Sequence, residues 1–145
     1  MNLSDFITNQ DKKDTKAHYL RLIQVSKADG TISPDEFETL HKEGRKFGLT
    51  DPEIDQLINM ESKVHYEAPY SLDEKFEHLV GVARIILTDG KINDNERKLI
   101  RKFAVEAGFD ERAIDKLLEV LFVGIVKNES EEDMLIKFRR FLFVR

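Results

Sequence analysis

The feature that most constrains this chain is an internal repeat with a spacing of 60 residues. Nine of the 31 residue pairs between positions 27–57 and 87–117 are identical without a gap, including the shared pattern Asp-Gly-x-Ile-x-x-x-Glu. A repeated segment of this size is one supersecondary unit whose open apolar face is buried by its copy. We therefore expect residues 15–62 and 72–122 to form two similar units, packed about a pseudo-two-fold axis within one domain spanning residues 1–145.

Helix-start signals and apolar spacing predict that each unit contains three helices. Start signals such as Ser33-Pro34-Asp35-Glu36 combine an N-cap side chain with an acidic residue at the third helical position. The apolar residues between these signals recur with helical period. The fold class is therefore all-α, with seven to eight helices. The predicted helices cover residues 15–28, 34–47, 51–63, 72–88, 94–107, 111–127 and 131–143, with a short turn of helix at 4–9.

Two of these helices have special positions in the predicted fold. Helix 72–88 is apolar nearly all round, so we expect it to be the central one. The last helix, within residues 130–143, lies outside the repeat. Its apolar stripe predicts docking on the core, and the Phe-rich end that continues beyond it is also typical of a homodimer or partner contact, or of a membrane surface. The stripe and the end that follows it comprise Met134, Leu135, Phe138, Phe141, Leu142, Phe143 and Val144.

Composition excludes several classes of function. The chain has no cysteine, which excludes disulfides, thiolate nucleophiles and cysteine-ligated metal centres. A formal net charge of −5 argues against a general nucleic-acid binder. The N-terminus does not resemble a signal peptide, and no apolar run approaches the length of a membrane span. We expect a cytoplasmic protein without nucleic-acid or membrane-spanning function.

The repeated motif matches the second half of a calcium-binding EF-hand loop, but the first half is missing. Oxygen ligands are required at the first and third loop positions. One copy has Val25 and Lys27 there, and the other has Ile85 and Leu87. These side chains do not bind calcium, so an ordinary EF-hand is excluded in both copies.

Two interpretations of the motif remain. In the structural one, the glycine ends a helix in a left-handed conformation, the isoleucine enters the core and the glutamate caps the next helix. In the other, the two turns meet across the pseudo-two-fold axis and their carboxylates form a site for a divalent cation, calcium or magnesium. The candidate metal ligands are Asp29, Glu36, Asp89 and Glu96.

The duplicated motif resembles that of the tellurite-resistance protein B (TerB) family, a domain also found in the N-terminal region of some membrane-anchored J-domain co-chaperones. The matching strings are Lys27-Ala28-Asp29-Gly30-Thr31-Ile32-Ser33-x-x-Glu36 and Thr88-Asp89-Gly90-Lys91-Ile92-x-x-x-Glu96. The resemblance covers roughly residues 15–125. It implies a helical bundle, metal-binding acidic positions and association with stress-response or membrane-linked protein complexes rather than catalysis. Thr88 departs from the alanine that precedes the aspartate in the first copy.

Catalytic signatures are lacking elsewhere in the sequence. There is no Gly-rich phosphate loop, no His-Glu-x-x-His string and no recognisable Ser-His-Asp arrangement, so we assign no catalytic residue and no organic cofactor. His18 and His78 occupy equivalent positions in the repeat, and we expect them to have surface or packing roles. The main hypothesis is a non-catalytic binding or scaffold module with an unidentified protein partner. The alternative is a metal-dependent enzyme that uses the same four carboxylates.

Overall fold

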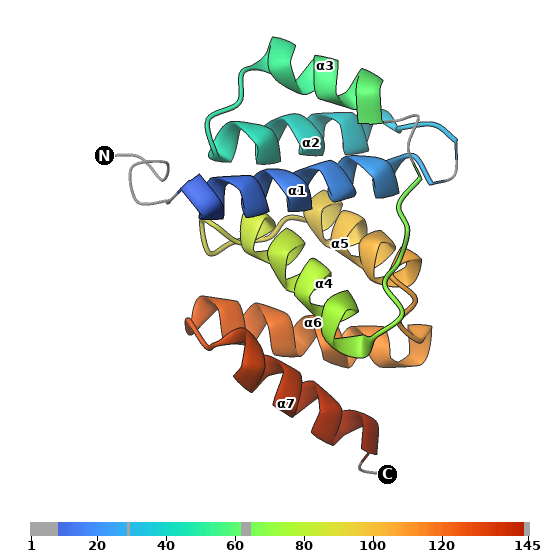
Figure 1. Ribbon diagram of the computed structural model, residues 1–145, viewed down its shortest axis with the longest axis vertical. Helices are drawn as coiled ribbons and strands as arrows, with labels where there is room; N and C mark the ends of the chain where they lie inside the picture. The colour runs from blue at the N-terminus through green and yellow to red at the C-terminus, as the bar shows by residue number, and fades with distance from the viewer. Residues whose placement is uncertain (1–8, 29, 62–64, 144–145) are drawn as a thin grey trace.

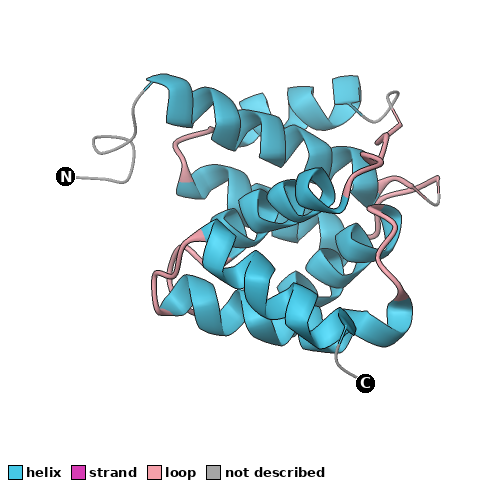
Figure 2. Cartoon of the chain, turned by 60° about the horizontal axis from the view of Figure 1, so that its bottom comes forward, coloured by secondary structure: helices cyan, strands magenta, loops and turns pink. Residues whose placement is uncertain are grey.

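The computed structural model describes residues 9–28, 30–61 and 65–143, and every regular element within these ranges is a helix (Figures 1 and 2). This confirms the predicted all-α class. The helices are α1 (Asn9–Ser26), α2 (Pro34–Lys46), α3 (Asp51–Glu61), α4 (Leu72–Ile86), α5 (Asp94–Glu106), α6 (Glu111–Val126) and α7 (Glu131–Phe143).

Most helices begin where the capping signals place them, whereas α1 departs from the prediction at both ends. It starts at Asn9 rather than at residue 15, because its polar first turns carry no apolar spacing that would mark a helix. The short helix predicted at 4–9 lies, apart from Asn9, outside the described residues. Helices α1 and α4 each end two residues earlier than predicted, because hydrogen bonds such as Ala28 N–H to the Val25 carbonyl close a tight turn there.

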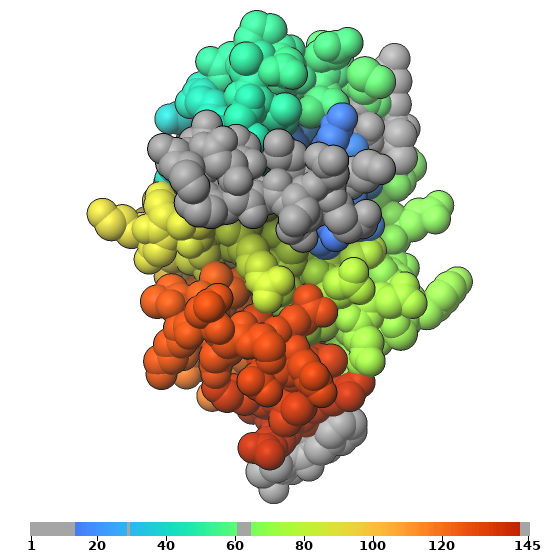
Figure 3. Space-filling model, turned by 60° about the vertical axis from the view of Figure 1, so that its left-hand side comes forward, coloured from blue at the N-terminus to red at the C-terminus, as the bar shows by residue number. Residues whose placement is uncertain are grey.

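The helices are stacked along the long axis of the molecule, with α2 and α3 at one end and α7 at the other (Figures 1 and 3). Helices α1 and α4 pack against each other in the middle. Other contacts between the halves are reciprocal. Helix α1 packs on α5, and α4, which is equivalent to α1 in the repeat, packs on α2, which is equivalent to α5. This arrangement brings the turn after α4 close to the end of α2.

Helix α4 occupies the central position that its composition predicts. It packs against α1, α2, α5, α6 and α7, and its buried side chains include Phe76, Leu79 and Val82. Helix α7 packs near the N-terminal end of α4, where Phe138 stacks on Phe76 with ring centroids 6.1 Å apart. Phe138 is only 1% exposed, which confirms that α7 docks on the core. Within the described ranges, no helix is both long enough and apolar enough to cross a bilayer.

Candidate functional site

The two motif glutamates cap the helices that follow them. Glu36 Oε1 accepts a hydrogen bond from the Ser33 N–H (3.1 Å), and the Ser33 hydroxyl accepts one from the Glu36 N–H. Glu96 and Asn93 make the same reciprocal pair, at 2.9 and 2.7 Å. Each pair satisfies two amide groups that a helix start leaves unpaired. The capping part of the structural interpretation is confirmed in both copies.

The isoleucines of the motif have the predicted role, whereas the glycines are left-handed as predicted but do not end the helices. Gly30 and Gly90 have φ angles of +104° and +74°, in the left-handed region that a side chain disfavours. They lie four residues beyond the last residues of α1 and α4 rather than directly at the helix ends. Ile32 and Ile92 are partly buried and pack against the hydrophobic core.

Each motif glutamate also faces a lysine from the other half of the molecule, Glu36 through its second oxygen Oε2 and Glu96 through the oxygen Oε1 that also caps α5. Lys102 of α5 donates from Nζ to Glu36 Oε2 (2.9 Å) and to the Ser26 carbonyl at the end of α1 (3.1 Å). In the opposite direction, Lys42 of α2 lies 3.2 Å from Glu96 Oε1. Lys42 and Lys102 are equivalent in the repeat, so these contacts cross between the halves reciprocally.

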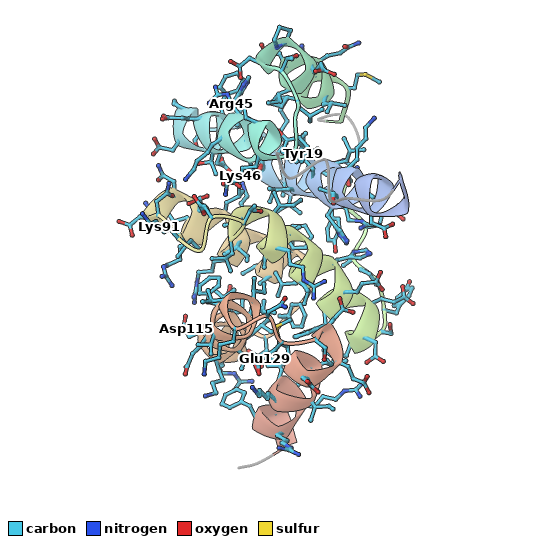
Figure 4. All side chains as sticks on the ribbon, turned by 90° about the vertical axis from the view of Figure 1, so that its left-hand side faces the viewer. Tyr19, Arg45, Lys46, Lys91, Asp115 and Glu129 are labelled. Atoms are coloured by element: carbon cyan, nitrogen blue, oxygen red, sulfur yellow. The ribbon has the colours of Figure 1, made fainter. Side chains whose placement is uncertain are left out.

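A second lysine of α2, Lys46, reaches the turn after α4 (Figure 4). Its Nζ lies 2.7 Å from the Ile86 carbonyl oxygen and 3.3 Å from that of Ile85. Two glutamates are also close, because Glu43 Oε2 lies 2.8 Å and Glu96 Oε2 lies 3.4 Å from the same nitrogen. The Asp89 carboxylate lies farther away, at 3.9 Å. We call this arrangement of Lys46 and its surrounding oxygens the Lys46 site.

Sequence reasoning missed Lys46 itself, and it also missed Glu43. Its side chain is completely buried, and neither carboxylate oxygen receives a well-aligned hydrogen bond within the described structure. Burial, reinforced by the neighbouring Glu96, raises the pKa of Glu43 to about 9, so the side chain is protonated at neutral pH and donates to Glu96. The repeat does contain a signal, because Glu43 is equivalent to Phe103, a fully buried core residue.

Glu96 is the ionised partner in this pair. Burial by itself would raise its pKa, but hydrogen bonds from the Glu43 carboxyl and the Asn93 amide, together with the lysines, outweigh that effect. The pKa of Glu96 consequently falls to about 2. The two glutamates thus hold one proton and one negative charge next to Lys46 at neutral pH.

The predicted metal ligands do not form a single cluster among the described residues. Glu36 and Glu96 face different lysines, and Asp89 is about half exposed. Asp29 lies outside the described residues. No group of three or more His, Cys, Asp or Glu side chains in the described part of the chain is arranged to hold a metal ion. The predicted divalent-cation site of all four carboxylates, which includes Asp29, therefore remains a prediction.

The histidines have packing and pairing roles. His18 and His78 meet where α1 crosses α4, with ring centroids 6.3 Å apart. Gly81 makes room for this crossing, since a Cβ on it would lie 2.3 Å from the His18 ring. Burial, aided by Arg21, lowers the pKa of His18 to about 4, which keeps the ring neutral at physiological pH. His41 joins α2 to α3 by hydrogen bonds to Asp51 (2.9 Å) and Asp55 (2.8 Å).

A groove of 440 Å³ runs between α5 and α6, away from the Lys46 site. Its α5 wall is cationic and consists of Arg97, Lys98 and Arg101. Its α6 side contributes apolar surface from Leu118, Phe122 and Val123. We call this feature the α5–α6 groove.

Comparison of the chain with protein-family models, curated proteins and solved structures found no match.

Proposed function

We propose that this chain is a non-catalytic binding module of the TerB type, and that it acts by holding a protein partner. The observation that carries the proposal is the reciprocal use of the motif glutamates. Glu36 and Glu96 each cap a helix with one oxygen and face a lysine of the other half with the second. Carboxylates that are engaged in this way hold two helical units together and are poorly placed to act as a general base. The duplicated motif and its resemblance to the TerB family support the same conclusion.

The surface best suited to a partner is the α5–α6 groove. Parallel or antiparallel helix pairs with an apolar floor commonly receive an amphipathic helix. Val123 is 44% exposed at this floor, and the Arg97 guanidinium lies 5.2 Å from the centre of the Phe122 ring. An apolar helix face would cover this surface.

The charges along the groove favour an acidic partner. On the α6 side, Asp115 pairs with Arg101 and Glu119 lies 3.7 Å from Lys116, so these carboxylates already have cations (Figure 4 labels Asp115). In the described part of the chain, neither Arg97 nor Lys98 forms an ion pair. Two unpaired cations beside apolar surface, on a chain of net charge −5, are complementary to an amphipathic helix with acidic flanks.

The test measures binding of a fluorescent model peptide by anisotropy. The peptide is an amphipathic helix of about 18 residues with leucines at helical spacing and glutamates on the flanks. We expect Arg97→Glu combined with Lys98→Glu to weaken its binding by about tenfold or more, because attraction becomes repulsion. Lys16→Glu, a charge reversal at another exposed position, on α1, is the control and should leave the affinity unchanged.

Two further probes make the result specific. A peptide with lysines in place of the glutamates should bind more weakly than the acidic one, and added salt should reduce that difference. Equal binding of both peptides, or no effect of the double charge reversal, would show that the groove is not the partner surface. Binding of a single-stranded oligonucleotide in preference to the acidic peptide would replace the proposal with nucleic-acid recognition.

A further inference from the structure

We infer that Lys46 is an internal counter-cation, whose ammonium group occupies a cation-binding site formed mainly by the opposite half of the chain. Four oxygens lie within 3.4 Å of its Nζ, namely the carbonyls of Ile85 and Ile86 and one oxygen each of Glu43 and Glu96. A fifth, from Asp89, lies at 3.9 Å. This inference does not depend on the proposed binding function.

The oxygens of the Lys46 site belong to the class that hard cations prefer. Carboxylates and backbone carbonyls are the usual ligands of calcium, and an ammonium group donates its three hydrogens to the same atoms. The carbonyls of Ile85 and Ile86 lie at the C-terminal end of α4, where the helix dipole favours a positive charge. Since Lys46 belongs to the same chain, its ammonium is held near these oxygens without the entropy cost of capturing a free ion.

The two halves differ at this point, and the difference provides an internal control. At the first turn, Lys102 faces the Ser26 carbonyl and Glu36, but the equivalents of Glu43 and Lys46 are Phe103 and Glu106. Phe103 is fully buried and offers no oxygen. The first turn therefore lacks the additional buried carboxyl and the additional lysine that form the Lys46 site.

The completely buried Glu43 is the second, independent sign of a cation site, because neither of its carboxyl oxygens accepts a well-aligned hydrogen bond within the described structure. A buried polar oxygen without a partner costs stability, and an adjacent cation reduces that cost whether or not the carboxyl carries a proton. Lys46 Nζ, 2.8 Å from Glu43 Oε2, is the cation that faces it. Removal of the Lys46 side chain would leave an oxygen-lined space beside these carboxyl groups, suited to a small ammonium or metal ion.

The experiment is chemical rescue of the Lys46→Ala variant by added cations, and the measured quantity is the melting temperature of the variant. We expect the variant to melt roughly 10 °C below the wild type, because a buried charge partner is lost. Ethylammonium chloride or calcium chloride should recover part of this loss. Tetramethylammonium chloride at matched ionic strength should not recover it, since tetramethylammonium has the same charge as ethylammonium but no N–H to donate.

The control variants separate the site from a general salt effect. Lys102→Ala should be destabilised, but ethylammonium and calcium should rescue it no better than tetramethylammonium does. Glu43→Leu combined with Lys46→Met should fold, and its melting temperature should not respond to ethylammonium or calcium. If Lys46→Ala is not folded in plain buffer, its recovery on refolding from urea in each salt gives the same comparison. Equal rescue by all three salts, equal rescue of Lys102→Ala, or wild-type stability of Lys46→Ala would each overturn the inference.

Discussion

The buried Glu43 makes the stability of the fold depend on pH. Its folded-state pKa of about 9 lies above the ordinary value of 4.5, so the folded protein binds more protons than the unfolded chain between these two pH values. Its contribution to stability is therefore complete below pH 4.5 and decreases as the pH rises towards 9. Glu96 behaves in the opposite way, since its lowered pKa of about 2 makes its contribution decline only as the pH falls from 4.5 towards 2.

Glu43→Gln should separate these two effects. Glutamine has the shape of the protonated glutamate and donates to Glu96 without titrating. Relative to the wild type, the variant should gain up to about 1.4 kcal/mol of unfolding free energy per pH unit between about pH 4.5 and 9. Urea unfolding at several pH values measures the difference, with the exposed Glu38→Gln on the same helix as control. A difference independent of pH would show that Glu43 is ionised in the folded protein.

The glycines of the two turns give a second prediction for single residues. A Cβ on Gly30 or Gly90 would meet no atom within 4 Å, so any cost of a substitution comes from the backbone conformation alone. Each Gly→Ala change should lower the free energy of unfolding by about 1 kcal/mol, because alanine disfavours a positive φ. Asparagine, which tolerates this region better, should cost less at the same positions. Thermal melts in which the alanine and asparagine variants are indistinguishable from wild type would contradict this account.

Helix α7 docks on the core through two buried side chains, Met134 and Phe138. Phe138 is 1% exposed and lies against both Phe76 and Phe109, with centroid distances of 6.1 and 5.9 Å. Phe138→Ala should lower the free energy of unfolding by about 3–5 kcal/mol, because it leaves a cavity between α7 and the core. Phe141→Ala is the matched control on the same helix, since Phe141 is 40% exposed and should contribute much less. Similar losses for both variants in urea unfolding would place the anchor elsewhere.

The helices show which parts of the structure a sequence can predict. Local signals sufficed for α2, α5 and α7, whose starts at Pro34, Asp94 and Glu131 follow directly from their capping residues. They failed for the start of α1, where a polar stretch forms helix without an apolar stripe. They also did not indicate which lysine would meet which glutamate, because the Lys46–Ile86 contact joins residues 40 positions apart. Within a helix, a charged residue such as Glu43 normally indicates a solvated face, and only its equivalence to Phe103 in the repeat pointed to its burial before the packed structure was known.

In the whole molecule, the two halves are joined by lysines that cross in both directions. Lys102 reaches the first turn from α5, while Lys42 and Lys46 reach the second from α2. Each acidic turn thus receives positive charge from the other half, and the ion pairs form only when the halves are assembled. This arrangement neutralises the repulsion that would otherwise favour a bound cation at these carboxylates.

Calcium binding tests this view for the molecule as a whole. Lysine ammonium groups already face Glu36 and Glu96, so we expect millimolar calcium to change the melting temperature of the wild type by less than about 1 °C. An occupied calcium site would instead stabilise the fold by mass action, by about 2.7 kcal/mol at a hundredfold excess over the dissociation constant. The comparison uses Glu36→Gln combined with Glu96→Gln, which keeps most of the capping ability and removes two charges. A calcium shift in the wild type that disappears in this double variant would establish the acidic turns as a metal site. It would also show that calcium displaces the lysines, since the metal and the ammonium groups compete for the same oxygens. A shift of equal size in both proteins would place calcium elsewhere on this acidic surface.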